Sequence, residues 1–224
     1  MLLAGLVVVM LFGPLAPGRW RFPAGMGAGA LLALWMYVGD DQSRAGLKWQ
    51  RGLEGERRTG KLLRDLERDG WVIRHDLAAE HGNVDHVAVG PAGVFLLDTK
   101  NWTGRLCIET DGTPVLEHPG EQARWPYPKL PRQLRAAAAE HHDRLDGFGV
   151  GRAWVQAVAV IWADFPAGVV EADRVAWVHG ERLVEWLRQR PVLPEMTVER
   201  INVLAAAHDQ IPSYEQQPAP TPPG

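Results

Sequence analysis

Cysteine is nearly absent from this chain, since Cys107 is the only one in 224 residues. A single cysteine excludes an intrachain disulfide and a thiolate metal cluster. A positive net charge is absent too, because 24 Lys and Arg residues stand against 27 Asp and Glu residues. With a formal net charge of -3, the chain lacks a global basic field, so any contact with nucleic acid has to be local.

Charged side chains are missing from two stretches near the N-terminus, residues 1–18 and 22–39. Each stretch is close to the length, about 18 residues, at which an apolar helix can cross a bilayer. Arg19, Trp20 and Arg21 separate them and suggest a short polar turn with an interfacial tryptophan. We therefore expect residues 1–40 to form a transmembrane helical hairpin that anchors the chain in membrane lipid.

Two other interpretations of this segment stay open. The first stretch could belong to a secretory signal peptide, although no basic residue precedes it. Pro14 and Pro23 weaken the two helices, so one span with one interfacial segment is the second alternative. The basic residues after the second stretch outnumber the two in the turn: Arg44, Lys48, Arg51, Arg57 and Arg58. This excess predicts a protein of the cell membrane with the bulk of the chain in the cytoplasm.

The remaining chain divides into one folded domain and a tail. Residues 45–211 are enough for a single domain with one sizeable core. Residues 212–224 are rich in Pro and Gln and are expected to be disordered. Helices are expected over 53–69, 132–146, 180–189 and 197–208, and strands over 71–75, 84–89, 94–99, 105–109, 153–162 and 175–178. This mixture indicates an α/β fold.

A β-hairpin is the most informative part of the domain. Gly90-Pro91-Ala92-Gly93 separates two β-rich runs and predicts a turn that sets Asp85 opposite Asp98. Side chains alternate along a strand, so Asp98 and Lys100 point to the same face. Two opposed carboxylates are unfavourable without compensation, and a hard cation with oxygen ligands would supply it. The other interpretations are solvated strand ends, or neutralisation by Lys100 alone.

The expected helix adds a third carboxylate. Thr59, Leu62, Leu63 and Leu66 define its buried arc, and Glu56 falls beside Leu63 on that arc. A carboxylate on an apolar face needs a partner. The alternative is that Glu56, near the first turn, only complements the helix dipole.

Three segments resemble the nuclease-related domain (NERD) family, part of the PD-(D/E)xK, restriction-endonuclease-like superfamily. They are Gly52-Leu53-Glu54-Gly55-Glu56, Gly82-Asn83-Val84-Asp85-His86-Val87, and the run from Gly93 to Gly104 that contains Asp98-Thr99-Lys100-Asn101-Trp102. The order Gly-Glu, Asp-His, (Asp/Glu)-x-Lys-x-Trp-x-Gly is specific, whereas an isolated D-x-K is not. The resemblance covers roughly residues 52–190 and implies a restriction-endonuclease-like mixed sheet flanked by helices.

The resemblance also implies roles for single residues. Asp85 and Asp98 would bind Mg²⁺ (or Mn²⁺), helped by the Thr99 carbonyl, with Glu56 as an accessory ligand. Lys100 would orient or deprotonate the attacking water and offset phosphate charge. Gln133 and Trp102 are accessory candidates, although Gln133 matches the family's Asn-Pro-x-x-Gln segment only in part. His86 is expected to point away from Asp85 and to be packed or hydrogen-bonded.

Together these features predict a membrane-tethered, Mg²⁺-dependent nuclease that hydrolyses phosphodiester bonds in DNA or RNA. The alternative is a non-catalytic membrane protein that uses a nuclease-like domain to bind nucleic acid or a protein partner. The complete set of Asp85, Asp98 and Lys100 favours the enzyme, because a binding module does not need all three.

Overall fold

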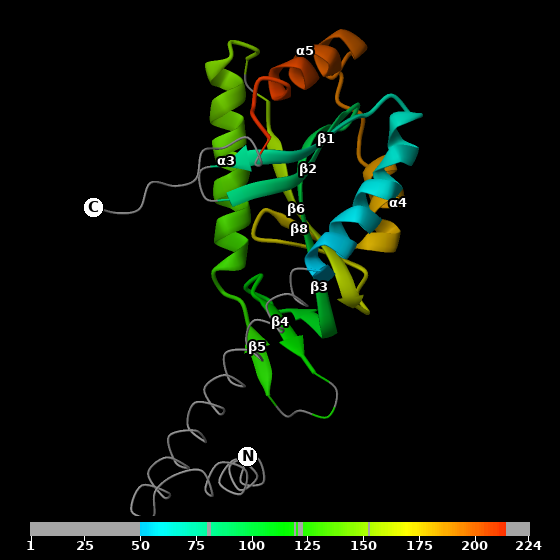
Figure 1. The fold of residues 1–224 in the computed structure, drawn as a ribbon, viewed down its shortest axis with the longest axis vertical. Helices are drawn as coiled ribbons and strands as arrows, with labels where there is room; N and C mark the ends of the chain where they lie inside the picture. The colour runs from blue at the N-terminus through cyan, green and yellow to red at the C-terminus, as the bar shows by residue number, and fades with distance from the viewer. Residues whose placement is uncertain (1–49, 80–81, 119, 121–122, 152, 214–224) are drawn as a thin grey trace, which may run out of the picture. The chain divides into compact units, whose positions relative to one another are not determined.

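The computed structural model of the chain describes residues 50–79, 82–118, 120, 123–151 and 153–213 (Figure 1). These residues form an eight-stranded mixed sheet with helices on both faces. The first described element is a helix over residues 50–67. The others are β1 (Val72–Ala79), β2 (Gly82–Gly90), β3 (Gly93–Ile108), β4 (Pro114–Glu117), β5 (Arg124–Pro126), α3 (Leu130–Gly147), β6 (Val155–Asp164), β7 (Val169–Ala172), β8 (Val175–His179), a 3₁₀ turn (Gly180–Arg182), α4 (Leu183–Arg188) and α5 (Val198–His208).

The expected hairpin is confirmed in its register. Val89 pairs with Val94 and Ala88 with Phe95, and the ladder continues to His86 and Leu97. The symmetric turn at Gly90–Gly93 sets this register, because Gly90 pairs with Gly93. Alternate residues of the hairpin therefore point to opposite faces of the sheet, as the sequence pattern predicts.

The centre of the sheet is parallel and its edges are antiparallel. Strand order is β1-β2-β3-β6-β8-β7, with β6 parallel to both β3 and β8. Helix α3 makes the connection that a parallel β3–β6 pair requires. The expected mixed α/β sheet flanked by helices is thus confirmed.

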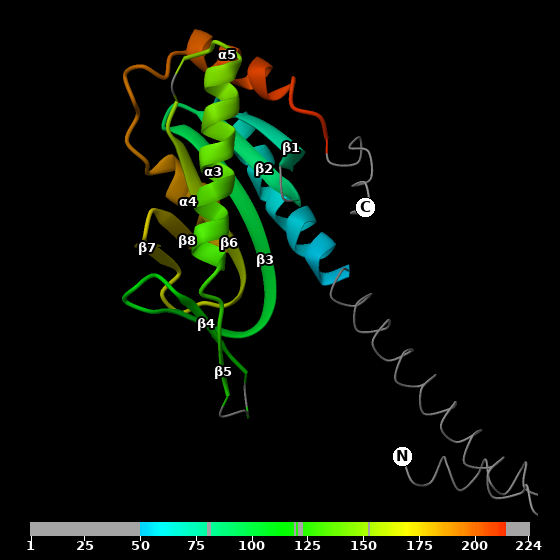
Figure 2. The same ribbon diagram turned by 90° about the vertical axis from the view of Figure 1, so that its left-hand side faces the viewer.

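Two apolar layers cover the sheet. On one face, α3 and α5 pack against Val87, Val89, Val94 and Leu96 through Leu134, Ala138 and Leu204. On the other face, Leu63 and Leu66 of the helix 50–67 and Leu183 of α4 pack on Ala88, Phe95 and Leu97. Figure 2 shows α3 lying along one face, and the helix 50–67 is seen beyond the strands.

The structure departs from the expected elements mainly around β3. The expected strand 105–109 is the end of β3, which runs on from the hairpin without interruption. The segment between the predicted strand 105–109 and α3 contains β4, which pairs with this end of β3, and β5, which pairs with β4; the three form an arm (Figure 2). The short β7 was also not expected, and the helix 50–67 ends two residues earlier than predicted.

Part of the predicted domain organisation lies outside the described residues. This holds for the predicted hairpin anchor, residues 1–40, and for residues 214–224 of the predicted tail. The first two tail residues are described: the carbonyl of Pro212 accepts the Ala78 N–H at 3.0 Å, and Ser213 bridges Leu77 of β1. Within the described part of the chain, every helix is too short or too polar to cross a membrane.

Candidate active site

The candidate site lies where β2 and β3 part. Their ladder ends at His86 and Leu97, while β2 stays paired with β1 and β3 stays paired with β6. Asp85 and Asp98 are the next residues in this register, directly beyond the last pair. The sequence therefore places two carboxylates at a point where the sheet opens.

Lys100 forms an ion pair with Asp98. Its Nζ lies 2.7 Å from Oδ2 of Asp98, and the two side chains are 26% and 19% exposed. Burial works against the charged form of Lys100, but the carboxylates of Asp98, Asp85 and Glu56 outweigh it and raise its pKa. The ammonium therefore stays protonated at neutral pH, as a fixed positive charge beside Asp98.

Asp85 is the most strained carboxylate of the group. It is buried, and burial together with the charge of Asp98 raises its pKa to about 7. Two interactions oppose this shift: the backbone N–H of Thr99 donates to Oδ2 of Asp85 at 2.6 Å, and the charge of Lys100 lowers the pKa. Near neutral pH, a cation or a proton at this carboxyl would relieve the cost of a buried negative charge.

Glu56 approaches from the helix 50–67. It is half-buried, and burial together with the charges of Asp76 and Asp98 raises its pKa, while Lys100 opposes the shift. The preceding Gly55 explains how this approach is possible. A Cβ at Gly55 would lie 2.8 Å from Cβ of Asn101, so only glycine lets the helix pack this closely on β3.

Thr59 fastens the same helix to the strand. Its hydroxyl donates to the Gly55 carbonyl at 3.1 Å and accepts from Nε1 of Trp162 at 2.9 Å. The hydroxyl of Thr99 also donates to it, at 3.2 Å. Because Thr99 in turn holds Asp85, this buried network links the helix 50–67, β3 and β6 to the position of one site carboxylate.

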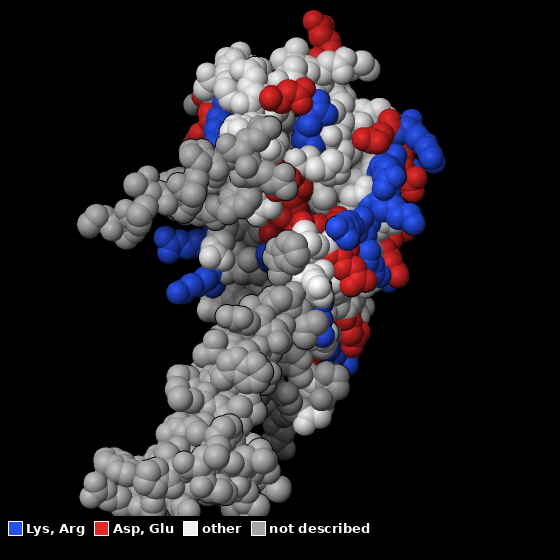
Figure 3. Space-filling model, in the orientation of Figure 1, with Lys and Arg blue, Asp and Glu red and all other residues white. Residues whose placement is uncertain are grey.

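Asp76 joins the acidic group and was missed from the sequence. It lies opposite Asp85 in the β1–β2 register, between the pairs His75–His86 and Leu77–Val84, and has a positive φ of 52°. Nδ2 of Asn83 donates to its carboxylate at 3.2 Å. Three neighbouring strands thus each contribute an aspartate, and Figure 3 shows acidic side chains between α3 and the helix 50–67. Asp76 can be assigned to this group only from the pairing of β1 with β2, and the sequence of β1 alone does not reveal that pairing.

A cleft of about 720 Å³ opens onto the ion pair. Its sheet side includes Leu96, Asp98 and Lys100, and its helix side comes from the start of α3. The polar side chains there are Lys129, Arg132, Gln133 and Glu140. The cleft therefore combines an acidic end with basic side chains, as a site for a phosphodiester requires.

The other predicted residues have distinct places. Gln133 lines the cleft with Asp98 and Lys100, whereas Trp102 stacks on Tyr127 at 5.0 Å between ring centroids. His86 is buried, and its Nδ1 lies 2.7 Å from Nδ1 of His75, which confirms that it is a hydrogen-bonded core residue. Burial lowers the pKa of His86 to about 4, with the charge of His75 adding to the effect, so it is neutral at pH 7.

The carboxylate oxygens of Asp85 and Asp98 are of the type that binds a hard cation, but they do not form a complete coordination shell. Among the described residues, no three His, Cys, Asp or Glu side chains are close enough together to hold a metal ion. The donors to Asp85 and Asp98 each reach one oxygen, Oδ2, and among the residues that the structure describes neither Oδ1 atom has a protein partner. These oxygens, beside a carboxyl whose pKa is raised, suit Mg²⁺ or Mn²⁺.

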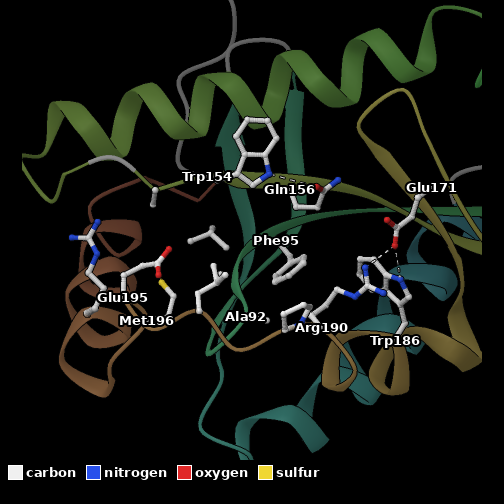
Figure 4. A pocket seen from close by; sticks show the side chains of 15 residues that line it. Ala92, Phe95, Trp154, Gln156, Glu171, Trp186, Arg190, Glu195 and Met196 are labelled. Atoms are coloured by element: carbon white, nitrogen blue, oxygen red, sulfur yellow. Dashed lines mark hydrogen bonds and ion pairs between the residues drawn. The ribbon is translucent and has the colours of Figure 1, made fainter.

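A second cavity of about 590 Å³ lies toward the other end of β3 (Figure 4). Phe95, Trp154 and Trp186 are among its lining residues. Its Glu171 accepts hydrogen bonds from Nε1 of Trp186 at 3.2 Å and from Nη1 of Arg190 at 2.7 Å. This carboxylate is already paired, and none of the predicted site residues lines the cavity, so we place the candidate site in the cleft at Asp98.

Comparison with known proteins supports the same segment. No curated protein and no solved structure matches this chain. The family model for the nuclease-related domain matches residues 51–162, which is half of the chain. This range contains Glu56, Asp85, Asp98 and Lys100 together with the cleft side of α3. The chain therefore belongs to the nuclease-related domain (NERD) family.

Proposed function

We propose that this chain is a Mg²⁺-dependent nuclease that hydrolyses phosphodiester bonds in DNA or RNA. Membership of a nuclease-related family suggests a nuclease-like function. The observation that carries the finer proposal is the pairing of Lys100 with Asp98 beside the buried Asp85, at the mouth of a cleft with further basic side chains.

In this proposal, Asp85 and Asp98 hold the cation through their Oδ1 atoms, assisted by the Thr99 carbonyl and by Glu56. When bound, the cation would polarise the phosphate and lower the pKa of a water molecule. The positive charge of the cation would also offset the charge of Asp98, which together with burial raises the pKa of Asp85. The Thr99 N–H keeps the Asp85 carboxylate in one orientation.

Lys100 acts as a cation in this site. Its raised pKa favours binding phosphate and orienting the attacking water over taking a proton from that water. Lys129 and Arg132 line the same cleft and would bind the flanking phosphates. Gln133 would add a neutral donor to the phosphate.

The N-terminal sequence supports a proposal for the location of the protein in the cell. We propose that residues 1–40 tether the domain of residues 45–211 to the cell membrane, on its cytoplasmic side. The support is the absence of charge over residues 1–18 and 22–39 and the excess of basic residues that follows. The substrate would then be cleaved beside the inner membrane surface.

Cleavage by the purified full-length chain tests the catalytic proposal. Labelled single- and double-stranded DNA and RNA should be cut with Mg²⁺ or Mn²⁺ and left intact with EDTA. Lys100→Ala should lower the cleavage rate by about 10²-fold or more, because the site loses the cation that stabilises phosphate charge. Lys61→Ala, on the exposed face of the helix 50–67, is the matched control and should cut like the wild type.

Folding of Lys100→Ala is checked by its melting curve. Cleavage by folded Lys100→Ala near the wild-type rate would exclude the role given to Lys100. Binding of nucleic acid without any metal-dependent cleavage by the wild type would favour the alternative, a non-catalytic domain.

A further inference from the structure

The arm formed by β4, β5 and the end of β3 extends the sheet at the end of α3 where the helix begins (Figure 2). Leu106 of β3 pairs with Leu116 of β4, which pairs with Trp125 of β5. Leu106 and Leu116 are buried, and Arg124 is held by Glu109 at 2.6 Å and by Glu117 at 3.0 Å. The arm is therefore a folded part of the domain with a defined side-chain arrangement.

Aromatic side chains are exposed on this arm. Trp125 is 51% exposed and Tyr127 is 37% exposed. The Tyr127 ring stacks on Trp102, with 5.0 Å between ring centroids and 16° between ring planes. Trp125 lies in β5, and directly after the strand the Tyr127 N–H donates to the Pro114 carbonyl of β4 at 2.9 Å, which continues the extended pairing. Because the two residues are two apart in this extended segment, their side chains point toward the same face. Exposed aromatic rings provide flat surfaces on which other rings can stack.

Tyr127 lies just before the start of α3, which forms one wall of the cleft. Trp102 follows Lys100 by two residues on β3 and packs against the apolar layer under α3, the layer on the cleft side of the sheet. The Tyr127 carbonyl accepts the N–H of Leu130 at 3.1 Å, where α3 begins. From there, Lys129 and Arg132 line the cleft with Asp98 and Lys100. Only a few residues of the sequence separate Tyr127 from the basic side chains that line the cleft with the ion pair.

The charges along this path suit a polyanion. Within the described residues, Lys129 and Arg132 have no acidic partner, whereas Arg124 on the arm is paired with two glutamates. Figure 3 shows basic side chains projecting from the lower end of α3, where the chain enters the helix. Unpaired basic side chains beside exposed aromatic rings match the two needs of a nucleic-acid strand, phosphate neutralisation and base stacking.

We propose that Trp125 and Tyr127 form a stacking platform for unpaired bases, and that the substrate of this site is single-stranded nucleic acid. Lys129 and Arg132 bind the backbone between the platform and Asp98. A duplex hides the faces of its bases within its own stack, so only a single strand offers them to Trp125 and Tyr127. The inference rests on the proposed nuclease function, which it narrows to a substrate class.

Binding of single strands by the full-length chain in EDTA tests the platform without cleavage. Fluorescence anisotropy should show tighter binding to labelled oligothymidylate or oligouridylate than to a duplex. Trp125→Ala should weaken single-strand binding by about tenfold, and Trp125→Phe should restore most of it. The matched control is Trp154→Ala, because Trp154 is 65% exposed but lies at the other cavity.

Charge reversal tests the backbone contacts separately. Lys129→Glu and Arg132→Glu should each weaken binding to all single strands and reduce its salt dependence. Lys61→Glu on the helix 50–67 should leave both unchanged.

The platform is refuted if Trp125→Ala binds single strands as well as Trp154→Ala does, or if a duplex binds more tightly than a single strand. These outcomes leave the nuclease proposal intact, because metal-dependent cleavage is measured separately. Conversely, binding that depends on Trp125 without any metal-dependent cleavage would refute the nuclease proposal and retain the platform.

Discussion

Asp85 shows how single residues set the chemistry of the candidate site. Its carboxylate is buried beside Asp98 and has one backbone donor, the Thr99 N–H at 2.6 Å. Thr99 itself is fixed by the hydroxyl of Thr59, which belongs to another element. Uncharged residues therefore position the charged residues of the site. Thr99 and Thr59 contribute hydrogen bonds, and Gly55 contributes the space left by its missing Cβ.

Removal of the Asp85 charge should stabilise the metal-free protein. Asn at this position keeps an oxygen that accepts the Thr99 N–H, while the like-charge contact with Asp98 disappears. We expect Asp85→Asn to melt a few °C above the wild type in EDTA at about pH 8. Millimolar Mg²⁺ should raise the melting temperature of the wild type by mass action and that of Asp85→Asn much less.

Asp98→Asn is the comparison variant for this experiment. It also removes the like charge, but it takes away the partner of Lys100 at 2.7 Å, so we expect a smaller gain or a loss. If Asp85→Asn melts well below the wild type in EDTA, and metal shifts both alike, then Asp85 has a structural role and is not a metal ligand.

The site residues that could be predicted from the sequence are those on the β2–β3 hairpin, where side chains alternate between the two sheet faces. The Gly90–Gly93 turn sets the predicted register, which brings Asp85 and Asp98 to the end of the β2–β3 ladder. Period-two alternation puts Asp98 and Lys100 on one face, and their ion pair agrees with this. Asp76 was not placed, because the strand predicted over 71–75 ends before it, and its position opposite Asp85 depends on the β1–β2 register of the longer strand.

Helices α3 and α5 meet through two buried histidines. His141 and His208 are fully buried, and their rings stack at 6.1 Å between centroids. Nδ1 of His141 lies 3.3 Å from the Ala137 carbonyl, and Nδ1 of His208 lies 2.7 Å from the Leu204 carbonyl. Both Nε2 atoms are buried without a hydrogen-bond partner in the described residues. The contact between the two helices therefore depends on neutral imidazoles.

Acidification should loosen this contact. Burial, with the charges of His208 and Arg144, lowers the pKa of His141 to about 4, and burial also lowers the pKa of His208. The unfolded chain takes up protons near pH 6.5, whereas the folded chain does not, so stability falls as the pH drops from about 6.5 toward 4. His141→Leu should melt with a weaker dependence on pH over this range.

Leu145→Ala is the control for the histidine variant. Leu145 is a buried residue of the same helix, so its truncation should lower the melting temperature at every pH without changing the slope. Equal slopes for His141→Leu and the wild type would show that other groups cause the acid sensitivity. Arg74, Asp209 and Arg144 are the charged groups that act on the pair.

Prediction at the element scale succeeded for long, periodic segments. Helix α3 and strand β6 were located to within two residues, because each has one clear apolar pattern. Strands β4, β5 and β7 have three or four residues, and β4 and β5 contain Pro114 and Pro126. A run that short, with proline in it, resembles a loop until a partner strand is known, and the partner here is the end of β3.

For the whole molecule, the membrane tether is the prediction with the widest consequence. Full-length protein should sediment with membranes and resist extraction by high salt and by carbonate, because residues 1–18 and 22–39 carry no charge. A chain that begins near Ala45 should stay in the supernatant, and this is the matched control. Recovery of the full-length protein in the soluble fraction would show that these residues do not anchor it.

Strand β3 is the feature with the broadest consequence for the molecule's design. One strand carries the hairpin, then Asp98 and Lys100, then Trp102 and the base of the arm, and its register with β6 shifts between Asn101 and Arg105. At Gly104, with φ 112°, a Cβ would lie 2.5 Å from the Glu117 carbonyl oxygen, so the arm is seated on β3 by backbone contact. The arm and the ion pair consequently share one strand. A graft of either onto another protein would have to include β3, and would therefore transfer the other as well.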